Sequence, residues 1–108
     1  MTLQTNLGPQ ILEIKGTQLR VTMERFVDHG RFFHVATCYW EPRRTALEDG
    51  PSGTASTAYG FRLAWHSFAL HDRGRSEKRV LKIGVWDMGN DEAARAAILA
   101  CLRAMVST

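Results

Sequence analysis

The spacing of hydrophobic residues changes once along this chain, and this change constrains the fold more than any other feature. Leu19, Val21 and Met23 alternate with polar residues, which is the period-two pattern of a half-buried strand. From Asn90 onward, apolar residues recur every three or four positions, as on one side of an amphipathic helix. The sequence therefore predicts an antiparallel sheet followed by a C-terminal helix.

Turn residues divide the part of the chain before Asn90 into strands. Asp28-His29-Gly30 is a hairpin signal, because Gly30 can adopt the positive φ of a tight turn. The predicted strands cover residues 11–15, 18–24, 31–40, 59–71 and 79–88. For the strand 31–40 the pattern leaves two choices open, since the face away from the core carries either Phe32, His34 and Trp40 or Phe33 and Tyr39.

The predicted helix covers residues 90–106. Asn90 or Asp91 can cap its start, and Asp91 and Glu92 suit the positive end of its dipole. Its apolar stripe contains Ala94, Ala97, Ile98, Cys101, Leu102 and Met105. This helix is the one predicted element that can cover a sheet face. The expected fold is therefore α+β: an antiparallel sheet (a meander) of four to five strands with one C-terminal amphipathic helix packed on one face.

The length of the chain predicts a single domain over residues 1–108. Within it, the polar residues 1–9 are expected to form a loose N-terminal arm, and the Gly-, Pro- and Ser-containing segment 43–57 a mobile loop. The apolar runs are too short to span a bilayer, and the first residues lack the pattern of a secretory signal. Two cysteines do not make a disulfide framework, which favours a cytoplasmic location.

The residues that commonly carry catalysis or bind metals form no recognisable set. His34 and Cys38 share a face of one strand but lie roughly 13 Å apart at about 3.3 Å per residue, so the two cannot bind one ion. His66 and His71 point to opposite faces, and the histidines are expected to be partly exposed strand residues. Ser52 does not lie in a G-x-S-x-G elbow. We therefore predict a non-enzymatic protein without a metal or cofactor.

Positive charge is concentrated in one part of the chain. The net charge is +3, whereas residues 59–86 alone contain six basic and two acidic residues. Of the 14 basic residues, eleven are arginine, the side chain best suited to phosphates and stacked bases. A GC-rich genome that encodes arginine in place of lysine explains the same excess.

The strand pattern places aromatic and cationic residues together on the sheet face opposite the helix. Rings that stack on bases, beside cations that hold the backbone, form the combination that binds single-stranded nucleic acid. Basic residues at the tip of the last hairpin would extend the positive surface. The predicted nucleic-acid-binding residues are Arg20, Arg62, His66, Phe68, Arg73, Arg75, Lys78, Arg79, Lys82 and Trp86.

The same face supports a second hypothesis. A second copy of the chain can bury Trp86 and Phe68, because small sheets often hide an apolar face by dimerising. The expected function is therefore a binding module for single-stranded nucleic acid. The alternative is a protein–protein interaction or oligomerisation domain without nucleic-acid affinity. A homodimer is the expected assembly.

Overall fold

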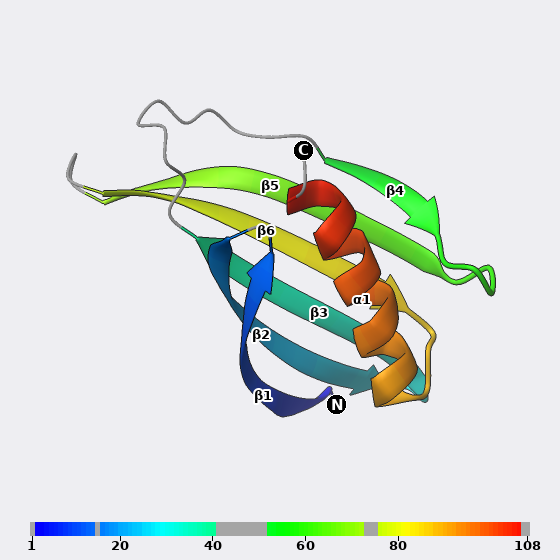
Figure 1. The fold of residues 1–108 in the computed structure, drawn as a ribbon. Coiled ribbons are helices and arrows are strands. Elements are labelled where there is room, and N and C mark those ends of the chain that lie inside the picture. The colour runs from blue at the N-terminus through cyan, green and yellow to red at the C-terminus, as the bar shows by residue number, and fades with distance from the viewer. Residues whose placement is uncertain (1, 15, 41–51, 73–75, 107–108) are drawn as a thin grey trace.

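The structure is a computed structural model, and it describes residues 2–14, 16–40, 52–72 and 76–106. In these ranges the chain forms one antiparallel sheet of six strands, in the order β1-β2-β3-β6-β5-β4, with one helix across one face (Figure 1). The elements are β1 (Leu3–Ile14), β2 (Thr17–Asp28), β3 (Arg31–Trp40), β4 (Ser52–Ser56), β5 (Arg62–Asp72), β6 (Ser76–Trp86) and α1 (Asp91–Val106). The predicted α+β class with a C-terminal helix is confirmed.

The predicted number of strands, four to five, is too low, because the short edge strand β4 lies inside the segment for which the sequence predicts a loop. β1 is predicted only in part, as the strand 11–15. β1 begins at Leu3, inside the segment 1–9 for which the sequence predicts a loose arm, and Leu3 pairs with Val27 of β2. Pro9, which has no N–H to donate, is tolerated there at a shift in register. β4 occupies residues 52–56 of the expected 43–57 loop, whereas residues 43–51 of that prediction lie outside the described residues.

The sheet is not a simple meander, because it consists of two three-stranded meanders joined side by side. β1, β2 and β3 are sequential neighbours, as are β4, β5 and β6, and the two sets meet where β3 pairs with β6. The β2–β3 turn follows the predicted signal: His29 and Gly30 both have positive φ values, 50° and 75°.

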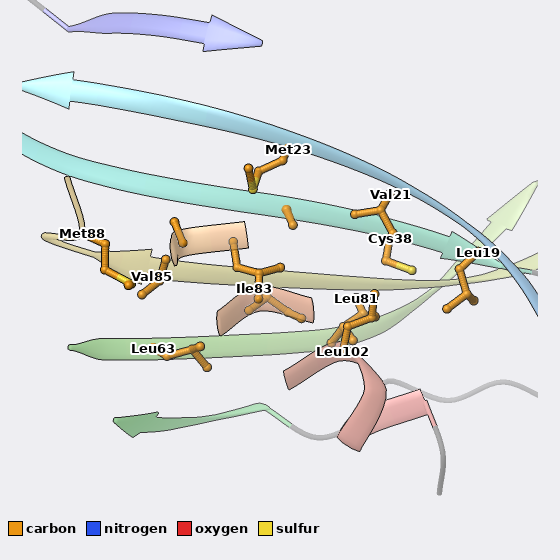
Figure 2. Close-up of a cluster of buried hydrophobic side chains, with 13 residues drawn as sticks. Leu19, Val21, Met23, Cys38, Leu63, Leu81, Ile83, Val85, Met88 and Leu102 are labelled. Carbon is orange, nitrogen blue, oxygen red and sulfur yellow. The ribbon is translucent and has the colours of Figure 1, made fainter. Parts of the chain in front are cut away.

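The core lies between the sheet and α1, and it contains the residues that the alternation predicts. Leu19, Leu63, Leu81, Ile83 and Val85 point from three strands toward the helix (Figure 2). Against them the helix packs its buried side chains, Ala94, Ile98 and Leu102. The choice left open for β3 is now settled. His34, Ala36 and Cys38 are buried on the helix side, so Phe33 and Tyr39 lie on the opposite face.

The start of α1 is fixed by Asn90 and leaves Asp91 available for other contacts. The Asn90 Oδ1 atom accepts hydrogen bonds from the backbone N–H groups of Glu92 (2.9 Å) and Ala93 (3.1 Å), which makes Asn90 the N-cap. The Asp91 side chain therefore turns toward the sheet, where it meets β2 and β3. α1 then packs over β6 and β3.

Candidate functional site

The sheet face opposite α1, here called the open face, carries six of the ten predicted binding residues. They alternate with buried core residues along their strands, as Arg20 does with Leu19 and Lys82 with Leu81. Arg20, Arg62, His66 and Lys82 are exposed, and Phe68 and Trp86 are half-buried. Because β2, β3, β6 and β5 pair without a register shift, the six residues lie on one continuous surface.

A row of aromatic rings crosses one end of the open face and ends at the guanidinium group of Arg62. The rings of Phe26 and Phe33 have centroids 6.1 Å apart, and those of Phe33 and Trp86 lie 4.8 Å apart. The guanidinium carbon of Arg62 lies 4.1 Å from the centroid of the Trp86 ring. Arg62 and Trp86 thus form a cation–π pair. The row runs across β2, β3, β6 and β5, at right angles to the strands.

Gly84 is what allows the Phe33 ring to lie down on the sheet. A Cβ atom at Gly84 would stand 2.7 Å from a ring carbon of Phe33, closer than side chains tolerate. A glycine inside a strand often marks such a close approach. The Phe33 ring therefore lies flat over Gly84 and does not stand upright from the sheet.

A second cluster lies farther along the same face. The His66 and Phe68 rings stack with centroids 5.3 Å apart and an interplanar angle of 25°. Lys82 stands directly opposite His66 in the neighbouring strand and opposite Thr37 on its other side. Tyr39 lies between Arg20 and the buried Val80. Cations are therefore interleaved with rings over the length of the face.

Charge at the rim beside the aromatic row is already paired. The Arg31 Nε and Nη2 atoms donate to the two Asp87 oxygens at 3.1 and 3.0 Å. The hydrogen bond from Arg31 lowers the pKa of Asp87, and nearby Arg62 lowers it further. A hollow of about 410 Å³, lined by residues that include Phe33, Trp86 and Asp87, opens between this ion pair and the rings.

Four predicted residues cannot be placed on the site. Arg73 and Arg75 lie outside the described residues. Lys78 and Arg79 belong to β6, where they pair with Leu70 and Ala69 of β5.

A polar cluster on the helix side was not anticipated from the sequence. His34 Nε2 lies 2.8 Å from Asp91 Oδ1, and Arg25 Nη1 donates to Asp91 Oδ2 at 2.6 Å. His34 is 0% exposed, so the expectation of partly exposed strand histidines is wrong for this residue. Because Asp91 of α1 contacts both Arg25 of β2 and His34 of β3, the cluster is a clamp between the helix and the sheet. Strand alternation is the sequence signal that could have revealed this cluster. Arg25 lies two residues after the buried Met23, and His34 lies two residues before the buried Ala36, so both belong to the face that the helix covers.

Both cysteine thiols are less acidic than an ordinary thiol. Burial raises the pKa of the Cys38 thiol to about 12 and also raises the pKa of Cys101. Within the described ranges, no three His, Cys, Asp or Glu residues gather closely enough to hold a metal ion. Over the same ranges, no helix has the length and apolarity needed to cross a membrane.

Comparison with protein-family models, with curated proteins and with solved structures finds no match to this chain.

Proposed function

We propose that the open face binds single-stranded nucleic acid. The observation that carries the proposal is the contact of Arg62 with Trp86, continued by Phe33 across three adjacent strands. A ring can stack on a base of any sequence, and a neighbouring cation can hold the phosphate that follows. Lys82 and Arg20 lie farther along the same surface and are exposed, so they are positioned to extend the path of the backbone.

The competing proposal is that the open face binds protein, either a partner or a second copy. Aromatic rings beside arginine are also common at protein interfaces. One observation favours nucleic acid: Arg20, Arg62 and Lys82 supply three exposed cations on this face. We also propose a cytoplasmic location, because Cys38 and Cys101 are both unpaired thiols.

The proposal predicts two different effects on oligonucleotide binding. Trp86→Ala should weaken binding by roughly 1–3 kcal/mol for the base that stacks there, at any salt concentration. Lys82→Ala should instead reduce the slope of log K against log salt by about 0.7, because the variant neutralises one phosphate fewer. Fluorescence anisotropy with a labelled single-stranded oligonucleotide, measured over a salt series, reports both quantities.

A matched control lies on the other side of the molecule. Tyr59→Ala removes an aromatic side chain that is 87% exposed on the helix side, and it should leave affinity unchanged. If wild-type protein gives no anisotropy change at low salt, nucleic-acid binding is excluded. If Trp86→Ala instead lowers the molar mass in light scattering, the open face is an oligomerisation surface.

A further inference from the structure

The hollow at the end of the aromatic row combines rings with charged groups. Its lining includes the aromatic residues Phe26, Phe33 and Trp86 and the charged residues Asp28, Arg31 and Asp87. Its volume of about 410 Å³ falls within the roughly 300–1,000 Å³ of small-ligand sites. Rings beside hydrogen-bonding groups suit a planar molecule that stacks on its face and is recognised along its edge.

The charges around this hollow disfavour an ionic ligand of either sign. A phosphate that entered it would meet the carboxylates of Asp28 and Asp87. A cation would meet the guanidinium group of Arg31, and also that of Arg62, which lies close enough to lower the pKa of Asp87. A neutral aromatic ligand avoids both repulsions. In a single strand of nucleic acid, the neutral aromatic part is the base.

Asp87 is held in a fixed orientation at the edge of the hollow. Its φ value of 66° lies in the left-handed region, and its N–H donates to the Phe32 carbonyl oxygen at 2.7 Å. Arg31 donates one hydrogen bond to each oxygen of the carboxylate. Because an ionised carboxylate has about four acceptor positions, each oxygen can accept one bond more. Asp87 therefore presents two preorganised acceptors side by side.

Two adjacent acceptors distinguish the bases by their Watson–Crick edges. Guanine presents two adjacent donors, the ring N1–H and the N2 amino group, so it can donate to both oxygens of one carboxylate. Adenine and cytosine each present one donor beside an acceptor nitrogen. Thymine and uracil present one donor between two carbonyl oxygens, which a carboxylate repels. An acceptor-only group such as Asp87 thus favours guanine over the other bases.

We propose that the hollow is a guanine subsite, in which the base stacks on the rings of Phe33 and Trp86 and donates to both oxygens of Asp87. This inference rests on the proposed binding of single strands to the open face. The phosphates that follow the base then lie toward Arg62 and Lys82, outside the hollow. The subsite adds a base preference to a surface whose stacking and charge accept any sequence.

Base analogues test the subsite in the unaltered protein by fluorescence anisotropy. Octamers that alternate thymine with guanine should bind roughly fivefold tighter than octamers that alternate thymine with adenine, the low end for bidentate recognition because Asp87 is half-exposed. Hypoxanthine in place of guanine lacks the N2 amino group and should remove most of this preference. 7-Deazaguanine lacks the N7 acceptor but keeps the Watson–Crick edge, so it should retain the preference.

Asp87→Asn tests the assigned residue. Asparagine has the same size and adopts the left-handed conformation readily, but its amide replaces one acceptor by a donor. The preference for guanine should therefore disappear, while the affinity for the thymine–adenine octamer should not fall. Glu92→Gln is the matched control, because it removes the same charge at an exposed position of α1, and it should keep the preference. Thermal melts verify that both variants are folded.

The outcomes separate this subsite from the proposed function. Equal affinity for the guanine and adenine octamers would overturn the subsite and leave single-strand binding intact, whereas no binding of any octamer would overturn both. Loss of the preference with 7-deazaguanine would overturn the role of Asp87, because Arg31 would then read the N7 and O6 atoms of guanine. Stronger competition by N-acetylarginine amide than by guanosine would also overturn the subsite, since the hollow would then bind a cationic side chain of a protein partner.

Discussion

At the scale of single residues, Asp91 joins three elements of the fold. It is the first residue of α1, and it binds His34 of β3 and Arg25 of β2. The hydrogen bond from His34 and then that from Arg25 lower the pKa of Asp91, although partial burial opposes them. The carboxylate is therefore favoured in the folded state. Its contribution to stability is present above the unfolded pKa of about 3.9 and is lost as the pH falls toward the lower folded value.

Asp91→Asn should consequently destabilise the protein in a pH-dependent way. Near neutral pH we expect a loss on the order of 1 kcal/mol, kept small because the side chain is about one-third exposed. The difference from wild type should shrink as the pH falls below about 4 toward the lowered pKa of folded Asp91, because the carboxylate is progressively neutralised over that range. Urea denaturation at several pH values measures it. Glu92→Gln is the control, because Glu92 is the exposed neighbour, and its effect should vary less with pH. A constant difference for Asp91→Asn would contradict the clamp.

At the scale of elements, the sequence predicts what is buried better than what is at an edge. Ile83 and Leu102 belong to regular hydrophobic patterns, of period two in the strand and of helical spacing in α1, because core residues surround both side chains. The sequence therefore predicts that both are buried. β4 has a strand neighbour on one side only, so its small and polar residues fit there and show no hydrophobic period. β1, the other edge strand, alternates only in its second half, which is the part that the sequence predicts. β2 continues to Asp28, past the predicted end at residue 24. The contribution of Phe26 to the aromatic row is missing from the sequence prediction for that reason.

The helix offers the simplest test of the core. Leu102 is 1% exposed and packs with the sheet residues under α1, so Leu102→Ala should lower the free energy of unfolding by about 2–5 kcal/mol. Leu3→Ala makes the same chemical change at a side chain that is 60% exposed, and it should cost within about 0.5 kcal/mol. Thermal or urea unfolding compares the two variants. Similar losses would mean that α1 does not cover the sheet as described.

At the scale of the whole molecule, strand parity brings the open face together from distant parts of the chain. Arg20, Arg62 and Trp86 come from three strands, and their shared face follows from alternation alone. Alternation does not give the order of these residues across the face, because that order depends on the pairing of β3 with β6. The alanines on the solvent side of α1, such as Ala96 and Ala100, are also visible in the sequence, but their exposure is not, since it depends on which strands α1 covers.

The junction between the two meanders has a consequence for how fast the protein folds. Each meander can form by closing short hairpins, but β3 must find β6 with two other strands intervening in the chain. Non-local pairing of this kind slows folding. Ile83→Val, in β6 opposite Ala36 of β3, should therefore reduce the folding rate, whereas Leu12→Ala in β1 should mainly accelerate unfolding. Stopped-flow kinetics over a urea series measures the folding rate and the unfolding rate of each variant separately. If both variants act on unfolding alone, the meanders dock only after the rate-limiting step.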